Sequence, residues 1–170
     1  MSDEPNEPDT SAGGAEERIE VQRNIPAEPT QVFAILCDPQ GHVTIDASGM
    51  LMGAAGDPAA KMGDQFVVHM DRQALNDYPI GRYDVTVTIT AFDRDREVAW
   101  TVASEGPSLG HVYGYTLEPV EAGTLVTSYY DWSGAQQDIK DLGIFPVISE
   151  TGLRATLGIL ERTLVRSSES

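Results

Sequence analysis

The chain has 170 residues, 41% of them hydrophobic, and its 27 acidic and 11 basic side chains give a formal net charge of −16 at pH 7. This length suits one domain with a sizeable core, and the acidic balance argues against binding to nucleic acid or to an anionic membrane. The single cysteine, Cys37, rules out an intrachain disulfide, the three histidines lack metal-ligand spacing, and we expect neither a metal nor another cofactor.

Residues 1–16 are rich in Pro, Glu, Asp, Ser and Gly. Such a segment buries too little apolar area to offset the entropy of ordering, so we expect a disordered acidic tail ahead of one domain over residues 17–168. The beginning of the chain lacks the basic flank and apolar run of a secretory signal, and no apolar window is long enough to span a bilayer. The sequence therefore indicates a cytoplasmic protein without stable membrane insertion.

Hydrophobic periodicity predicts one strand, two short helices, six further strands and one long helix, in that order. The expected strands cover residues 18–25, 50–54, 65–71, 82–92, 97–103, 111–119 and 124–132. The short helices lie near residues 29–37 and 40–45, and the last helix covers residues 147–165. Unbroken alternation in the fourth strand places these residues on one face: Tyr83, Val85, Val87, Ile89 and Ala91.

Short turns between consecutive strands imply an antiparallel meander, and only the last helix is long enough to cover its apolar face. The predicted fold is therefore α+β, a curved antiparallel sheet of about six to seven strands wrapped around the C-terminal helix. Gly152, Ala155 and Gly158 thin one flank of that helix, and we expect them to leave space beside the sheet.

Several motifs accompany this order of elements. They are Ile25-Pro26-Ala27 after the first strand, Gly63-Asp64-Gln65-Phe66, and the segment 115–119 followed by 123–127. Together they resemble the START-like, or SRPBCC, helix-grip superfamily, and more narrowly its polyketide cyclase/dehydrase and lipid transport proteins. Segments 41–49 and 130–133 are similar to actinobacterial members. The resemblance implies a hydrophobic ligand held between sheet and helix, with cyclisation or dehydration catalysed there in some members.

Side chains with polar tips occupy positions that should face the interior. By strand parity, His111, Tyr113 and Tyr115 share a face, as do Tyr130 and Trp132. An unpartnered buried polar group costs about 1–3 kcal/mol, so these groups must bond one another, water or a ligand. We expect the ligand-binding residues to be Ser48, Tyr83, Trp100, Tyr113, Tyr115, Tyr130 and Trp132. An internal polar network without a ligand is the alternative.

Candidate catalytic residues are His42, Asp46 and His111. On a helix, His42 and Asp46 lie one turn apart, and a carboxylate that orients an imidazole is a general-base arrangement. In the alternative interpretation His42 caps or pads the helix at the cavity mouth, while Asp46 and Ser48 build the turn into the next strand.

These patterns favour a module that binds a hydrophobic small molecule, a lipid, a polyketide-like compound or an aromatic compound. The alternative is a polyketide cyclase/aromatase or dehydratase with His, Asp and Tyr as acid–base groups in the same cavity. A third hypothesis, regulation by protein interaction, rests on the acidic surface alone. The sequence leaves open turnover, a homodimer, and whether the loops over 53–63 and 76–81 gate the cavity.

Overall fold

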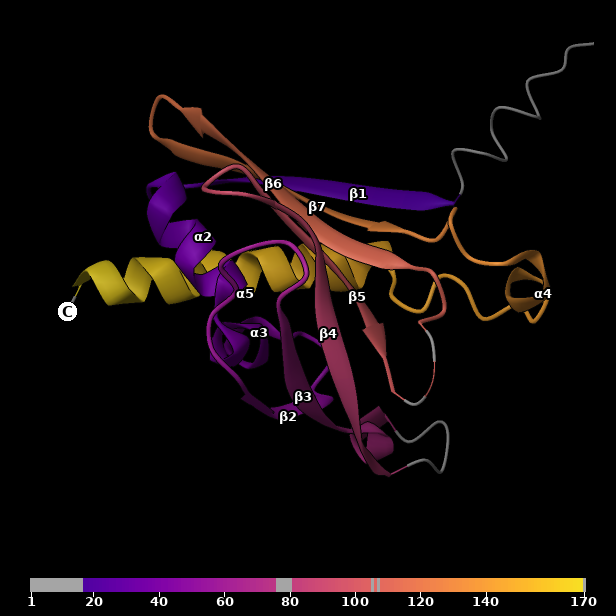
Figure 1. Ribbon diagram of the computed structural model, residues 1–170. Helices are drawn as coiled ribbons and strands as arrows, with labels where there is room; N and C mark the ends of the chain where they lie inside the picture. Colours follow the sequence, from indigo (N-terminus) through magenta and orange to yellow (C-terminus); the bar gives the residue numbers. More distant parts are fainter. Residues whose placement is uncertain (1–16, 76–80, 105, 107, 170) are drawn as a thin grey trace, which may run out of the picture.

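The computed structural model describes residues 17–75, 81–104, 106 and 108–169 (Figure 1). The expected tail over residues 1–16 and most of the loop over 76–81 lie outside the described residues, so those two predictions stay predictions.

Seven antiparallel strands form one sheet in the order β1-β7-β6-β5-β4-β3-β2. The strands are β1 (Arg18–Ile25), β2 (Leu51–Ala55), β3 (Gln65–Asp71), β4 (Arg82–Asp93), β5 (Glu97–Ala103), β6 (Val112–Val120) and β7 (Gly123–Asp131). The strands from β2 to β7 form a meander, and β1 pairs with β7 at one edge. The predicted strands agree with these bounds to within one residue at either end.

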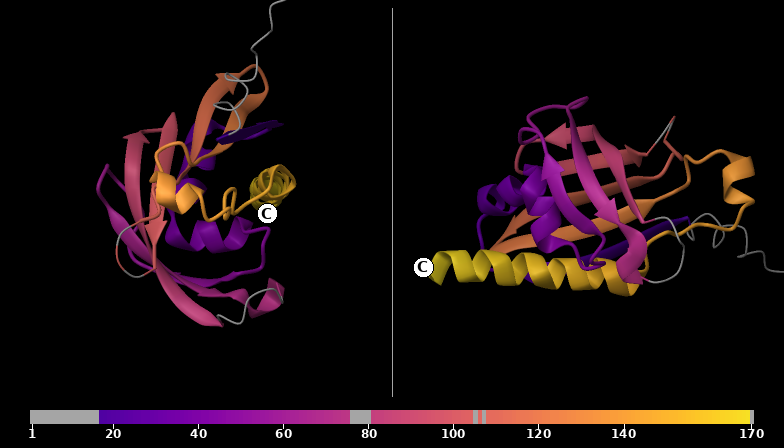
Figure 2. Two further views of the ribbon diagram at one scale, coloured as in Figure 1. Left: turned by 90° about the vertical axis from the view of Figure 1, so that its right-hand side faces the viewer. Right: turned by 90° about the horizontal axis from the view of Figure 1, so that it is seen from below.

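Three helices lie on the concave side of the sheet, which curves around them in Figure 2. Two of them, α2 (Pro29–Cys37) and α3 (Pro39–Ile45), follow β1, and α5 (Glu150–Glu169) ends the described chain. The long α5 packs against β1 and β7, and α3 packs against β2 and β3. The α+β prediction of a curved antiparallel sheet around the C-terminal helix is confirmed, although the two short helices share in covering the sheet.

The long helix begins three residues later than predicted, at Glu150 rather than at position 147. Ser149 provides the start, since its hydroxyl accepts the backbone N–H of Gly152 at 2.9 Å, an N-cap bond. Val147 lies outside the helix and is 47% exposed. Two short elements were not predicted, the 3-10 turn η1 (Arg72–Leu75) and α4 (Gln137–Lys140).

A bulge in β4 interrupts the predicted alternation. Ile89 pairs with Trp100 and Ala91 with Ala99, so one residue of β4 is left over between them. Beyond the bulge, Phe92 rather than Ala91 turns to the core, where its ring centroid lies 5.3 Å from that of Phe33. The predicted inward position of Ala91 is therefore wrong.

Contrary to the prediction, the small residues of α5 do not face the tyrosines. A Cβ at Gly158 would lie 4.0 Å from the Arg23 guanidinium at the β1 rim, and a Cβ at Gly152 would meet Ile148 and Ser149. The buried face of α5 consists of Leu153, Leu157, Leu160 and Leu164. The predicted space between α5 and the sheet is therefore not supported, because these leucines pack α5 against the core.

Candidate functional site

One cross-strand row on the concave face carries large rings from three adjacent strands. Trp100 of β5 pairs with Tyr113 of β6, and Tyr113 pairs with Tyr130 of β7. Helix α5 packs on β1 and β7, α3 packs on β2 and β3, and α2 packs on β5, β6 and β7 (Figure 2).

These rings contact one another and neighbouring rings in a continuous chain. The centroids of Tyr113 and Tyr130 lie 4.8 Å apart, and those of Trp100 and Tyr113 lie 6.1 Å apart in a stacked arrangement. We call the connected side chains the aromatic cluster: His42, Phe66, Trp100, His111, Tyr113, Tyr115, Tyr130, Trp132 and Phe145. Five of the ring-bearing ligand candidates predicted from the sequence therefore belong to this one cluster: Trp100, Tyr113, Tyr115, Tyr130 and Trp132.

His111 is the polar centre of the cluster. It is 3% exposed, and its Nδ1 lies 2.7 Å from the hydroxyl oxygen of Tyr130. Its Nε2 is the one buried side-chain nitrogen or oxygen atom, among the described residues, without a hydrogen-bond partner. Burial lowers the pKa of His111 to about 4, so the ring is neutral at pH 7.

The buried tyrosines of the cluster are neutral as well. Burial raises the pKa of Tyr115 to about 12, although the hydroxyl of Ser128 works against the rise. Burial also raises the pKa of Tyr130, opposed by the backbone amide of Val147. The pKa of Tyr113 is raised by burial and by the nearby hydroxyls of Tyr130 and Tyr83. These hydroxyls therefore act as hydrogen-bond donors and acceptors rather than as charges.

The predicted pairing of His42 with Asp46 does not form. His42 Nε2 donates to the carbonyl oxygen of Leu36 at 2.7 Å, and burial lowers the pKa of this ring. Helix α3 ends at Ile45, and Asp46 has an extended backbone with ψ of 125°, so the one-turn spacing is lost. His42 instead packs its ring on Trp100, with 4.6 Å between centroids.

Asp46 and Ser48 build the turn into β2. Oδ1 of Asp46 accepts the backbone N–H of Ser48 at 3.0 Å and its hydroxyl at 2.8 Å. Oδ2 accepts the backbone N–H groups of Gly49 and Leu51. Both side chains are therefore engaged in the turn, as the alternative interpretation of the sequence stated.

Phe145 is a member of the cluster that the sequence did not single out. It lies in the irregular segment before α5, its ring stacks on Trp132 with centroids 6.3 Å apart, and it meets His111 edge-on at 5.8 Å. It is half-buried, whereas its neighbour Ile144 is 40% exposed. Phe145 therefore contacts the buried His111 and is itself partly open to solvent. A large aromatic residue inside a loop, next to Pro146, is the signal that could have identified it.

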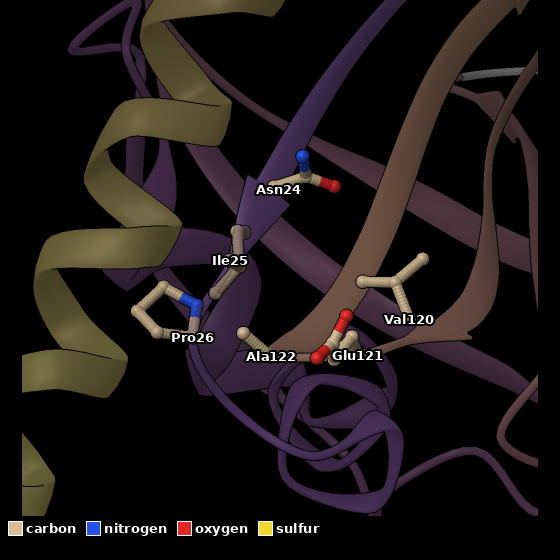
Figure 3. Close-up of a pocket in the computed structure, with 6 residues that line it drawn as sticks. All are labelled: Asn24, Ile25, Pro26, Val120, Glu121 and Ala122. Atoms are coloured by element: carbon tan, nitrogen blue, oxygen red, sulfur yellow. The ribbon is translucent and has the colours of Figure 1, made fainter.

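A surface hollow of about 410 Å³ lies elsewhere, where the end of β1 meets the β6–β7 turn (Figure 3). Its lining is Asn24, Ile25, Pro26, Val120, Glu121 and Ala122. None of the predicted site residues lines it, and it holds no unpartnered buried group, so the aromatic cluster is the better candidate site.

A family model described as polyketide cyclase / dehydrase and lipid transport matches residues 16–164. The chain belongs to this family. It has the helix-grip, START-like fold that the sequence predicted. No curated protein matches it significantly. Within the described residues, no helix combines the length and the apolar character needed to cross a membrane.

Solved structures of low sequence identity share the fold. A protein from Nitrosomonas europaea is 16% identical over 92% of this chain and 99% of its own, with a TM-score of 0.67. An AHSA1-like protein from Aeromonas hydrophila is 16% identical over 90% of this chain and 95% of its own, with a TM-score of 0.59. An Aha1 dimer from Colwellia psychrerythraea is 18% identical over 85% of this chain and 92% of its own, with a TM-score of 0.54.

Proposed function

We propose that the domain over residues 17–168 binds a hydrophobic small molecule, a lipid, polyketide-like compound or aromatic compound, at the aromatic cluster between the sheet and α5. The observation that carries the proposal is the unpartnered Nε2 of His111, buried among rings. A fold without a ligand gains nothing from such a group, because a buried polar atom with no partner is destabilising. The family description, which includes lipid transport, points to the same class of ligand.

The make-up of the cluster suits such a ligand. Rings supply most of the surface, and a few polar atoms on His111, Tyr113 and Tyr115 lie among them. Ligand sites for small molecules combine apolar walls with few convergent polar groups in this way. Burial of apolar area provides affinity, and the polar atoms orient the ligand.

The alternative function is that of a cyclase/aromatase or dehydratase at the same site, with His111 and Tyr130 as the acid–base pair. Their 2.7 Å contact is the observation in its favour. However, an imidazole with a pKa of about 4 is a weak base near pH 7, where general bases are most effective with a matched pKa. We therefore rank binding ahead of turnover.

Entry of a ligand requires a movement, since His111 and Tyr130 are almost fully buried. We assign the gate to Phe145 and its loop, because Phe145 contacts His111 while Ile144 and Val147 of the same loop are exposed. The variant Phe145→Ala should speed the association of a hydrophobic dye in stopped-flow measurements, whereas Val147→Ala should not. Equal association rates in both variants would remove the gate from the proposal.

Two measurements test the binding function. Mass spectrometry of an organic extract of the purified full chain should find an apolar compound in near-stoichiometric amount. Titration of the delipidated chain with the neutral dye N-phenyl-1-naphthylamine should give saturable 1:1 fluorescence enhancement, weakened about tenfold by Tyr113→Ala. The matched control is Tyr129→Ala, which alters a tyrosine on the opposite face of the sheet. Absence of both a co-purified compound and saturable binding would refute the proposal.

Turnover and assembly are measured with the same preparation. If the recovered compound changes with time in the presence of the chain, and His111→Phe abolishes the change, the enzyme alternative replaces the binding proposal. The Colwellia psychrerythraea protein is a dimer. For this chain a homodimer stays a prediction, which light scattering after size-exclusion chromatography would check.

A further inference from the structure

The hydrogen bond of Tyr130 determines which nitrogen of His111 carries its proton. The Tyr130 oxygen has one hydrogen-bond partner among the described side chains and backbone groups, Nδ1 of His111 at 2.7 Å. The hydroxyl proton of Tyr130 therefore has one acceptor, Nδ1 of His111.

This places the proton of the imidazole on Nε2. A neutral imidazole has one N–H and one bare nitrogen, and the bare nitrogen here is the Nδ1 that accepts from Tyr130. The unpartnered buried atom is therefore a donor, an N–H group. The opposite tautomer would leave two groups without a partner, the bare Nε2 of His111 and the hydroxyl proton of Tyr130.

The surroundings of Nε2–H offer rings in place of an acceptor. The centroids of Tyr113 and Phe145 lie 5.3 and 5.8 Å from that of His111, both in edge-on geometry. A contact between an N–H and a ring face is much weaker than a bond to oxygen and does not replace one. Both of these rings are half-buried.

We infer that the ligand carries a neutral hydrogen-bond acceptor, a ketone, aldehyde or ester carbonyl, on an apolar skeleton, and that this oxygen accepts from Nε2–H of His111. The inference rests on the proposed function and names the chemistry of its ligand. Tyr130 acts as the positioning residue, because it holds the tautomer.

An anionic ligand fits less well. No Lys or Arg belongs to the aromatic cluster, and Arg23, at the β1 rim beside α5, pairs with Glu161 at 2.6 Å. A carboxylate in the cluster would lose its hydration without meeting a counter-charge. The net charge of −16 adds a further repulsion.

Calorimetric titration of the full chain with three matched probes tests the inference. The probes are 2-acetylnaphthalene, 2-isopropenylnaphthalene, in which CH₂ replaces the carbonyl oxygen, and 2-naphthoate. We expect the ketone to bind about 3- to 10-fold more tightly than the alkene, the net effect of one hydrogen bond, and more tightly than the carboxylate. The variant His111→Phe should bind ketone and alkene equally, while Tyr129→Phe should keep the wild-type ratio.

The outcomes separate the inference from the function on which it rests. A folded His111→Phe that retains the ketone preference, or a wild-type chain that prefers the alkene or the naphthoate, overturns the inference and leaves hydrophobic binding in place. If none of the three probes binds saturably, the proposed function fails with it.

A measurement on the wild-type chain makes the test independent of whether His111→Phe folds. Nitrogen-15 NMR of histidine-labelled protein should show the proton on Nε2 of His111 and a shift of that N–H signal when the ketone is added. A proton on Nδ1, or an N–H signal unmoved by saturating ketone, overturns the inference.

Discussion

Tyr129 and Tyr130 are neighbours in β7, and they face opposite sides of the sheet. The outer ring, Tyr129, lies over the backbone of Gly114, and its hydroxyl donates to Glu97 at 2.7 Å. The guanidinium of Arg18 lies 4.2 Å from the centroid of the same ring. The inner ring, Tyr130, joins His111, whose Nε2 has no partner among the described residues.

The difference shows what aromatic crowding does by itself. Both tyrosines are buried, yet the outer one has every polar atom matched by a group of the protein. An unmatched atom is therefore not a by-product of packing rings in this sheet. The unpartnered Nε2 of His111 lies on the concave face, where a ligand can supply the missing hydrogen-bond partner.

The largest effect should come from breaking the outer arrangement with Gly114→Ala. A Cβ at position 114 would overlap Cζ and Oη of Tyr129. We expect a loss of about 3 kcal/mol in the free energy of unfolding, typical of overpacking, measured by urea denaturation. In a Tyr129→Ala background the same change should cost almost nothing, and equal costs in both backgrounds would contradict this account.

Acid should weaken the inner region. Burial holds the pKa of His111 near 4, below the value of 6.5 for an exposed ring, so the unfolded chain binds a proton that the native chain does not. The contribution of this group to stability should be full above pH 6.5 and be lost as the pH drops from 6.5 to 4, by about 3 kcal/mol. Burial of His42 acts in the same direction.

The contribution of His111 to this acid effect is isolated by subtraction. Denaturation of wild type and His111→Phe at several pH values should show a shallower dependence in the variant. Parallel curves would mean that His111 does not titrate in this window.

Removing one hydroxyl from each side compares the two regions directly. Tyr129→Phe and Tyr130→Phe should each lower the free energy of unfolding by about 1 kcal/mol, the net effect of a hydrogen bond. Only Tyr130→Phe should weaken the binding of 2-acetylnaphthalene, by about threefold, because without the Tyr130 hydroxyl the proton of His111 is no longer held on Nε2. An equal loss of affinity in Tyr129→Phe would show that the effect passes through general stability.

The smallest effect belongs to the exposed part of the outer region. Arg18 pairs with Glu20 at 2.8 Å and with Asp131 at 3.1 Å, and its side chain is 40% exposed. Arg18→Gln should cost about 0.5 kcal/mol in low salt and less in 0.5 M salt, since exposed ion pairs are screened. A cost that does not change with salt would assign the effect to contact with the Tyr129 ring instead.

The strands were predictable because each buries one face, and alternation records that face in the sequence. For this reason parity alone identified Trp100, Tyr113 and Tyr130 as inward residues, and the structure places them in one row. Parity failed after Ile89, where the bulge shifts the register and brings Phe92 to the core. One extra residue in a strand leaves no mark in composition.

The site was harder to predict because it depends on contacts between distant segments. The spacing of His42 and Asp46 indicated a pair, but helix α3 ends between them and each side chain bonds to nearby backbone. Phe145 lies in a segment without periodicity, so nothing local showed that it would reach His111. The tautomer of His111 depends on its contact with the hydroxyl of Tyr130, which is known only once the chain is folded.

The aromatic cluster also contains both tryptophans of the chain, Trp100 and Trp132. The protein's near-ultraviolet emission therefore comes from two indoles in the proposed site and from no other indole. Occupancy of the site, displacement of Phe145 and loosening of the row would each change the wavelength or lifetime of that emission. The chain thus contains its own optical reporter of the proposed site, which needs no label.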